Sequence, residues 1–202
     1  MSRKITLNRE TKETQIELIL DIDGIGNNSI NTGIGLFDHL LEQVAIHGAF
    51  DLEIQAKGDL HIDAHHLIED IGIVLGKAFK KALGDKKGIM RTANSYFPLD
   101  EALTRVVIDI SGRPYLAMNV NWSTKFIGSK REFIIPVSLI EHFLYSFIIN
   151  AGLTTHIHVL SGKDDHHIAE SIFKGLGKSL DKATRINKKK RNQIPSSKGM
   201  IE

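Results

Sequence analysis

The segment HHLIEDIGIVLGK at residues 65–77 indicates a duplicated fold, because much of it returns as HHIAESIFKGLGK at residues 166–178. The His-His-x-x-Glu and Leu-Gly-Lys elements both recur at a spacing of 101 residues. Asp38-His39-Leu40-Leu41 has a looser counterpart in Glu141-His142-Phe143-Leu144 at a spacing of 103, which a two-residue difference in loop length would explain. Two matches in one register indicate the duplication of a unit of about half the chain.

Each half of the duplication shows the pattern of strands and helices. Alternating apolar and polar residues predict strands at 16–20, 52–54, 103–110, 115–122 and 155–160. Apolar residues spaced three to four apart predict helices at 36–47 and 137–151, which end at Gly48 and Gly152. The repeated segments, 65–83 and 166–185, form the second helix of each half. We therefore expect an α+β fold with halves at 1–88 and 89–202, and two sheets with helices packed between or against them.

Composition narrows the class of protein. The 202 residues are 42% hydrophobic, which suits a globular protein with a substantial core. The chain has no cysteine, so any metal must be held by nitrogen and oxygen donors. The formal net charge of +2 gives no global case for nucleic-acid binding. The sequence shows neither an apolar signal region nor an apolar run of membrane-spanning length, so we expect a cytoplasmic protein.

The histidine pairs have a spacing that suits metal ligation. Residues four apart share one face of a helix, so the first histidine of each pair can bind one ion together with a glutamate: His65 with Glu69, and His166 with Glu170. Adjacent side chains diverge by about 100° around a helix, so the second histidine of each pair points to another partner. One helix can therefore serve two ions.

Pseudo-symmetry of the halves indicates two ligand sets, each with three imidazoles and one carboxylate. They are His65, Glu69, His142 and His167 for one ion, and His166, Glu170, His39 and His66 for the other. Four protein donors leave two positions of a six-coordinate ion open, as a catalytic site needs. These donors favour manganese over zinc only weakly, because imidazole binds both.

A plainer interpretation exists for these residues. A single His-His-x-x-Glu motif more often marks a solvated polar helix face, and the second copy in register reverses that weighting. His39 and His142 taken alone would be helix-surface residues, whereas their matched placement favours ligation. Asp70 either supports a ligand from behind or serves as a cap or a surface charge. We expect three other histidines to face solvent without a function: His61, His156 and His158.

Several runs give the sequence a resemblance to a known family. They are 9–14 (RETKET), 32–39 (TGIGLFDH), 65–70 (HHLIED), 98–102 (PLDEA), 109–114 (DISGRP), 165–170 (DHHIAE) and 195–199 (PSSKG). In this order they span nearly the whole chain, and they resemble imidazoleglycerol-phosphate dehydratase of histidine biosynthesis. The departures, Leu36-Phe37 and Tyr96-Phe97, are apolar and do not touch the motifs.

The resemblance implies a fold and an assembly. In the family each half is a four-stranded sheet packed on two helices, of the ribosomal S5 domain 2-like type. The subunits form a homo-oligomer, a 24-mer built from trimers, and neighbouring subunits share the sites. The partners implied are a small-molecule phosphate substrate and copies of the chain, without nucleic acid or membrane.

The resemblance also implies a reaction. Two Mn²⁺ ions per active site would hold the substrate's imidazole ring as imidazolate. Water would then leave D-erythro-imidazole glycerol phosphate through a diazafulvene, giving imidazole acetol phosphate. Glu13 would be the acid-base residue and contact the substrate, His47 would be a second proton carrier, and Gln43 would line the substrate. Without the family match, Glu13 would be only a charged residue before a strand.

Basic and hydroxyl side chains would bind the substrate phosphate. By resemblance these are Arg91, Arg113, Lys174, Ser196, Ser197 and Lys198, and forked guanidinium donors suit a phosphate. Taken without the family, residues 188–191 (KKKR) and the Ser-Lys tail would be a solvated, mobile end or a minor nucleic-acid patch. The family interpretation makes the tail a lid on the substrate.

Two other classes of protein explain part of the pattern. A dinuclear metallohydrolase acting on phosphate esters shares these residue types, but it usually needs a carboxylate bridging ions about 3.5–4 Å apart and ligands on strand-end loops. A non-catalytic metal- or nucleic-acid-binding protein leaves Glu13, Arg91 and Arg113 without roles. Release of inorganic phosphate would support the hydrolase, whereas a ketone that retains its phosphate would support the dehydratase.

Overall fold

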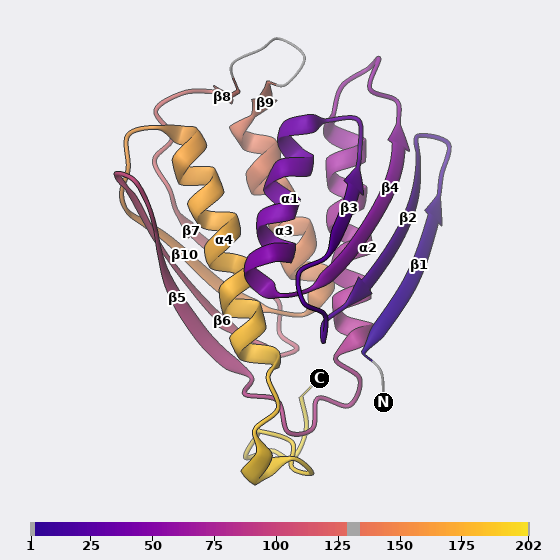
Figure 1. Cartoon of the computed structure of the whole chain (residues 1–202), viewed down its shortest axis with the longest axis vertical. Helices are drawn as coiled ribbons and strands as arrows, with labels where there is room; N and C mark the ends of the chain where they lie inside the picture. Colours follow the sequence, from indigo (N-terminus) through magenta and orange to yellow (C-terminus); the bar gives the residue numbers. More distant parts are fainter. Residues whose placement is uncertain (1–2, 129–133, 202) are drawn as a thin grey trace.

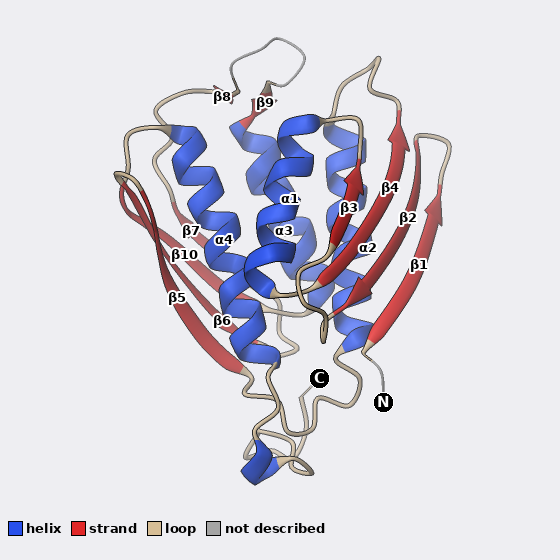
Figure 2. Ribbon diagram, viewed as in Figure 1, coloured by secondary structure: helices blue, strands red, loops and turns tan. Residues whose placement is uncertain are grey.

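Two β-sheets enclose four helices in the computed structural model, which describes residues 3–128 and 134–201. Figure 2 shows the helices as a middle layer with one sheet on either side. The predicted α+β fold is confirmed, with the helices between the sheets. Residues 1–2, 129–133 and 202 of the expected halves lie outside the described residues.

The first sheet has the strand order β1-β2-β4-β3, with β3 parallel to β4 and the other pairs antiparallel. The elements of this half are β1 (Lys4–Glu10), β2 (Thr14–Asp21), β3 (Asn28–Asn31), α1 (Gly35–Gly48), β4 (Asp51–Gly58) and α2 (His65–Ala82). Ile16, Leu18 and Leu20 of β2 are buried against the helices, while Glu17 between them is exposed. The alternation therefore places one face of the sheet on the core and leaves the other outside.

The second sheet repeats this arrangement in the order β5-β6-β10-β7, with β10 and β7 again parallel. Its elements are β5 (Thr92–Leu99), β6 (Ala102–Asp109), β7 (Tyr115–Asn119), α3 (Val137–Ala151), β10 (Thr154–Ser161) and α4 (Asp165–Thr184). A short ribbon of β8 (Phe126–Ile127) and β9 (Ile135–Pro136) precedes α3, and a 3-10 turn, η2 (Lys188–Lys190), follows α4. The equal strand order and pairing in both halves confirm the internal duplication.

The helices of the two halves interlock, because α2 packs against α3 and α1 packs against α4. The repeated Leu-Gly-Lys motif lies at these contacts. A Cβ atom on Gly76 would lie 2.6 Å from the carbonyl oxygen of Phe147 in α3, and one on Gly177 would lie 2.6 Å from that of Val44 in α1. Each repeated glycine therefore allows the backbone of a helix from the other half to approach closely.

Alanine at Gly76 or Gly177 is expected to lower the free energy of unfolding by about 1–3 kcal/mol, because the added methyl group overlaps a helix backbone that is packed in place. Urea unfolding followed by circular dichroism measures this change. Lys77→Ala, at the exposed neighbouring position of α2, should stay within about 0.5 kcal/mol of wild type. A Gly76→Ala protein as stable as the Lys77→Ala control would contradict this role of the motif.

Aromatic side chains from all four helices meet in the middle layer. The ring of Phe143 in α3 lies 5.1 Å from that of Phe37 in α1 and 5.5 Å from that of Phe173 in α4. The ring of Phe147, one turn further along α3, lies 6.0 Å from that of Phe79 in α2. These offset and edge-on contacts fix the positions of the helices relative to one another.

Some predicted boundaries are wrong. Helix α1 ends at Gly48 as predicted, the left-handed residue that follows it is Ala49, with φ 52°, and the missing side chain of Gly48 leaves room for the ring of Phe50. The end of α3 is as predicted, with Gly152 at φ 72°. Strand β7 stops at Asn119 rather than at 122. The apolar alternation does not predict strands β1, β3 and β5, because it is weak in all three segments.

Asp70 has a structural role that neither predicted alternative describes. It is buried, and its carboxylate lies 2.8 Å from the guanidinium of Arg9 in β1 and accepts a hydrogen bond of 2.5 Å from the hydroxyl of Thr14 in β2. Asp70 therefore ties α2 to the first sheet instead of supporting a ligand or capping the helix.

No helix within the described ranges is long and apolar enough to cross a membrane.

Candidate metal centre

All four helices begin at the same end of the molecule, and their first two turns carry the histidines of two clusters (Figure 1). We call His65, Glu69 and His142 the first cluster. Its ligand atoms lie within 4.8 Å of one another. The Nε2 atom of His65 is 3.8 Å, and that of His142 3.5 Å, from oxygens of the Glu69 carboxylate. The cluster joins α2 of one half to α3 of the other.

The second cluster consists of His39, His166 and Glu170, again with ligand atoms within 4.8 Å of one another. The Nε2 atoms of His39 and His166 lie 3.5 and 3.4 Å from the same Glu170 oxygen. It joins α4 to α1. The exchanged packing of the helices thus brings together, in both clusters, the motif of one half and the upstream histidine of the other half.

The donor chemistry of the clusters fits a divalent cation. Each offers two imidazole nitrogens and one carboxylate, a combination typical of transition-metal ligation. The Nε2 atom of His142 is buried and has no hydrogen-bond partner among the described residues. A buried polar atom without a partner is costly, and a cation between His142 and Glu69 would satisfy it. The clusters are therefore consistent with metal binding.

The two clusters differ in electrostatics. Lys174 lies 2.6 Å from Glu170, whereas the position equivalent to Lys174 in α2 is Ile73. Burial acts to raise the pKa of Glu170, but the hydrogen bond and charge of Lys174, together with His39, outweigh it and lower that pKa. The carboxylate of the second cluster is consequently charged but already partly neutralised by an ammonium group.

The second histidine of each pair is not part of a cluster in this chain. His66 Nδ1 lies 3.0 Å from a carboxylate oxygen of Asp59, and His167 Nδ1 lies 2.8 Å from one of Glu101. These hydrogen bonds raise the pKa of both imidazoles. The structure thus does not bring His167 to the first cluster or His66 to the second within one chain, although both expected ligand sets included them.

Glu101 and Asp59 are candidate site residues that the sequence did not reveal. Glu101 also accepts hydrogen bonds from the backbone N–H groups of Asp164 and Lys163, and these bonds with that of His167 lower its pKa to about 2. The sequence does carry a signal for Asp59, because it is a carboxylate in the loop just before the His65-His66 pair. Glu101 lies 66 residues before His167, so only the fold could connect them.

The acid-base residues implied by resemblance lie in different surroundings. Glu13 is exposed in the turn between β1 and β2, with its carboxylate 3.9 Å from His66 Nδ1. The ring of His47 packs edge-on against Phe97 at 4.9 Å. Burial and the charges of Lys174 and Lys178 lower the pKa of His47, so that its imidazole is neutral and able to accept a proton at neutral pH. Gln43 donates a hydrogen bond to the backbone oxygen of His39.

The predicted phosphate ligands are not gathered at the clusters of the same chain. Arg91 binds the Asp109 carboxylate through two nitrogens, at 2.7 and 3.1 Å, and donates to the carbonyl oxygen of Pro195. Arg113 is exposed after β6. Lys174 is the exception, because it contacts Glu170 of the second cluster.

The C-terminal tail, with Ser196, Ser197 and Lys198, lies beyond the far end of α4 (Figure 1). A helix of 20 residues is about 30 Å long, so the tail is distant from His166 at the start of α4. It is not a free end, since Gly88 donates a backbone hydrogen bond of 2.8 Å to Gln193, and Ile89 pairs with Ile186.

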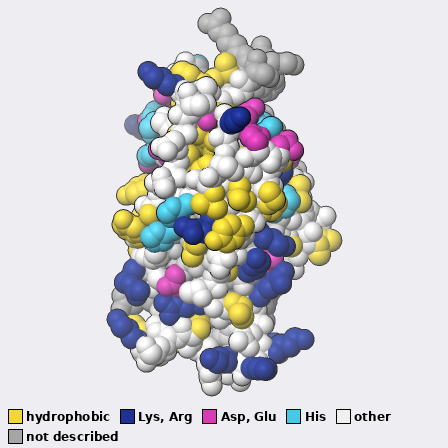
Figure 3. Space-filling view, turned by 90° about the vertical axis from the view of Figure 1, so that its left-hand side faces the viewer, with side chains coloured by type: hydrophobic (Ala, Val, Ile, Leu, Met, Phe, Trp, Pro, Cys, Tyr) yellow, Lys and Arg dark blue, Asp and Glu magenta, His cyan; other side chains and the backbone are white. Residues whose placement is uncertain are grey.

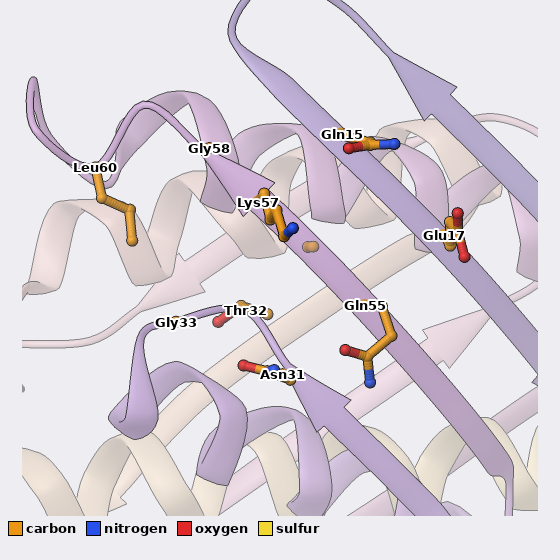
Figure 4. Close-up of a pocket in the computed structure, with 10 residues that line it drawn as sticks. Gln15, Glu17, Asn31, Thr32, Gly33, Gln55, Lys57, Gly58 and Leu60 are labelled. Atoms are coloured by element: carbon orange, nitrogen blue, oxygen red, sulfur yellow. The ribbon is translucent and has the colours of Figure 1, made fainter.

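One surface pocket lies beside a predicted metal ligand, and another lies away from all the predicted site residues. One of about 440 Å³ lies beside the second cluster, between the segment 123–128 and the start of α4, and His166 lines it. Another, of about 650 Å³, lies on the outer face of the first sheet and is shown in Figure 4. Gln15, Glu17 and Lys57 line it, and none of the predicted site residues does. We therefore assign the site to the helix ends.

Comparison with known proteins decides the family. The family model "Imidazoleglycerol-phosphate dehydratase" matches residues 32–180, which include both clusters. The chain belongs to the imidazoleglycerol-phosphate dehydratase family. A curated dehydratase of this name from Methylobacillus flagellatus is 49% identical over 199 residues, 98% of each chain. One from Acetivibrio thermocellus is 47% identical over 201 residues and covers 100% of both. As a member of this family, the protein is an enzyme of the hydro-lyase class.

Solved dehydratase structures share the fold. The imidazoleglycerol-phosphate dehydratase of Staphylococcus aureus superposes with a TM-score of 0.80 at 37% identity, covering 91% of this chain and 99% of that one. The enzyme of Pyrococcus furiosus, solved in complex with (S)-C348, gives a TM-score of 0.79 at 35% identity, with 96% and 99% covered. The fold and the family resemblance stated from sequence are both confirmed.

Proposed function

We propose that this protein removes water from D-erythro-imidazole glycerol phosphate and forms imidazole acetol phosphate in L-histidine biosynthesis in the cytoplasm. The observation that carries the proposal is the pair of His-His-Glu clusters at the helix ends of a chain that belongs to the dehydratase family. We place the duplicated units at 1–88 and 89–202, which assigns α2 and α4 to different units.

We further propose that two Mn²⁺ ions serve each active site. The ligands would be the first cluster with His167, and the second cluster with His66, the second histidines coming from neighbouring subunits. When bound, the ions supply positive charge that stabilises the substrate's ring as imidazolate, so that the hydroxyl can leave through a diazafulvene. His65, His142, His39 and His166 all present Nε2 toward the cluster carboxylate, the orientation that a shared cation requires.

Proton transfer falls to side chains that stand free of the clusters. In our proposal Glu13 moves the proton at the reacting carbons, because its carboxylate is exposed and lies beside His66. His47 is the second proton carrier, since its lowered pKa keeps a lone pair available. Gln43 holds the backbone of His39 and contributes to the substrate site.

The side chains that would bind the phosphate of the substrate do not lie together within one chain. We assign this role to Arg91, Arg113, Lys174, Ser196, Ser197 and Lys198. The distance between the tail and the clusters of its own chain is the reason to place the tail over the site of a neighbouring subunit.

We also propose an assembly with shared sites, the 24-mer built from trimers, and exposed apolar side chains on the outer surface support it. Figure 3 shows hydrophobic side chains across the middle of the face formed by the second sheet, with Lys and Arg side chains below them. Tyr96, Val107 and Tyr115 are exposed there. Exposed apolar side chains gathered on one face are typical of a contact surface between subunits.

Deleting residues 195–202 is expected to raise the KM for the substrate by about tenfold or more, with a smaller change in kcat, because the tail would supply charge-assisted hydrogen bonds to the phosphate. Steady-state kinetics of the truncated protein measures this. Deleting only 200–202, which spares Ser196, Ser197 and Lys198, is the control. Kinetics unchanged by the longer deletion would remove the tail from the site.

An assay of metal-stripped protein tests the proposed function. After addition of Mn²⁺ and the substrate, we expect a ketone product that retains its phosphate. Inorganic phosphate released in place of the ketone would identify a phosphate-ester hydrolase instead. A protein that binds Mn²⁺ but converts no substrate would support a non-catalytic metal-binding protein.

A further inference from the structure

The duplication relates Glu13, in the turn between β1 and β2, to Glu101, in the turn between β5 and β6. The register pairs Leu7 with Leu18 in the first hairpin and Ser95 with Val106 in the second. Both residues of the second pair lie 88 positions after those of the first, and the same shift carries residue 13 to residue 101. The two glutamates therefore occupy equivalent positions in the two halves.

Both glutamates approach the histidine that stands outside the clusters of the same half. The Glu101 carboxylate lies 2.8 Å from His167 Nδ1, within hydrogen-bond distance, whereas the Glu13 carboxylate lies 3.9 Å from His66 Nδ1. The turn has thus kept its position in both halves, but only the second half uses its glutamate to hold the imidazole.

In the first half Asp59 takes that hydrogen bond. It comes from the connection between β4 and α2, which has six residues, 59–64. The corresponding connection between β10 and α4 has only three, 162–164. The longer connection brings a carboxylate to 3.0 Å from His66 Nδ1, and the side chain of Asp59 is only 13% exposed while that of Glu13 is 56% exposed.

The hydrogen bond to Nδ1 determines which nitrogen of the ring can bind a metal. A carboxylate only accepts, so in the neutral imidazoles of His66 and His167 the hydrogen is on Nδ1 and Nε2 keeps its lone pair. Glu101 is held as an acceptor by the backbone N–H groups of Lys163 and Asp164. Such carboxylate–histidine pairs fix the orientation of a metal-binding imidazole.

We infer that Asp59 and Glu101 are positioning residues, which present Nε2 of His66 and His167 to the ions, and that the presence of Asp59 releases Glu13 for proton transfer. The inference rests on the proposed function, since it assigns these histidines to metal ligation. It explains why one member of an equivalent pair of glutamates is free and exposed and the other is bound.

Three variants of the full-length protein separate the roles: Asp59→Asn, Glu101→Gln and Glu13→Gln. Binding of Mn²⁺ without substrate is measured by electron paramagnetic resonance of the free ion, and kcat is measured at saturating Mn²⁺. Asp59→Asn and Glu101→Gln are expected to weaken Mn²⁺ binding by about 10- to 100-fold while excess Mn²⁺ restores most of kcat. Glu13→Gln is expected to bind Mn²⁺ like wild type and to lose about 100- to 10,000-fold in kcat at any Mn²⁺ concentration.

Two further variants control for charge and folding. Glu53→Gln removes one charge from an exposed position of β4 and should leave both readouts unchanged. Glu101→Asp keeps a carboxylate, whose two oxygens can accept from the backbone of Lys163 and Asp164 and from His167 Nδ1, so it should lose less Mn²⁺ affinity than Glu101→Gln. Circular dichroism checks that each variant is folded.

The outcomes distinguish this inference from the proposed function. Unchanged Mn²⁺ affinity in folded Asp59→Asn and Glu101→Gln would overturn the positioning role. A loss of Mn²⁺ affinity in Glu13→Gln as large as that in Asp59→Asn would overturn the division of roles. A wild-type protein that binds no Mn²⁺ would instead remove the metal centre itself.

Discussion

Replacing Glu170 by glutamine is expected to lower kcat/KM by about 1,000-fold at a fixed Mn²⁺ concentration, the equivalent of about 4 kcal/mol of lost charge stabilisation. The amide oxygen of glutamine carries no negative charge, so the second cluster would lose its only carboxylate. In the wild-type structure the Lys174 ammonium lies 2.6 Å from the Glu170 carboxylate, and the substitution leaves this ammonium beside the cation without a negative partner. Repulsion by this ammonium adds to the lost ligand.

The matching change in the first cluster provides the comparison. Glu69→Gln removes the equivalent carboxylate, but Ile73 stands where Lys174 stands in the second cluster. We therefore expect Glu69→Gln to lose less Mn²⁺ affinity than Glu170→Gln, and Lys174→Met to restore part of the affinity in the Glu170→Gln background. Titration with Mn²⁺ monitored by the free ion measures all three proteins. Equal losses in the two single variants would show that Lys174 does not act on the cation.

Removal of the metal is expected to reduce the mass of the assembly about eightfold, from the proposed 24-mer to trimers. Each cluster has three protein donors in its own chain, while the Nδ1 atoms of His66 and His167 are held outside the clusters. In the proposed ligand sets the fourth donor, a third imidazole, comes from another subunit, and metal-mediated contacts of this kind depend on the ion. Light scattering with and without EDTA measures the mass.

Adding Mn²⁺ back provides the control for the chelator. The large assembly should return with Mn²⁺ and should fail to return with Mg²⁺, which prefers oxygen ligands. A mass that EDTA leaves unchanged would argue that each ion is bound within one chain or that subunit contacts hold without it.

The internal repeat in the sequence predicts most of the fold. Segments 65–83 and 166–185 are helices α2 and α4 within one or two residues at each end, and helical spacing alone placed Glu69 and Glu170 with their histidines. The equal spacing of the motifs implied equivalent sheets, which the structure confirms. The family match added the dehydratase name, which the spacing of a few histidines could not supply.

The parts that the sequence left open depend on contacts between distant residues. Nothing in the local pattern shows that α2 packs on α3 rather than on α1, although the glycine of Leu-Gly-Lys marks the contact once it is known. Glu101 and Asp59 belong to turns of different length and lack a common spacing from their histidines. Asp70 directly follows Glu69 in the motif, yet it faces the sheet because adjacent positions on a helix diverge.

The tail shows a further limit of local interpretation. A run of four basic residues followed by Ser and Lys has the composition of a solvated end. In the structure, Arg91 and Gly88 bind the tail through its backbone oxygens, which no side-chain pattern encodes. Because the tail lies at the far end from the clusters of its own chain, its proposed role requires the site of a second subunit to lie beside it.

Anomalous diffraction at the manganese absorption edge, from crystals of the intact protein grown with Mn²⁺, shows whether the two clusters bind metal. We expect two peaks per chain, one amid His39, His166 and Glu170 and the other amid His65, Glu69 and His142. Each peak should also contact Nε2 of a second histidine, His66 or His167, from a neighbouring subunit. Clusters that face bulk solvent with no anomalous peak at either position would contradict this expectation.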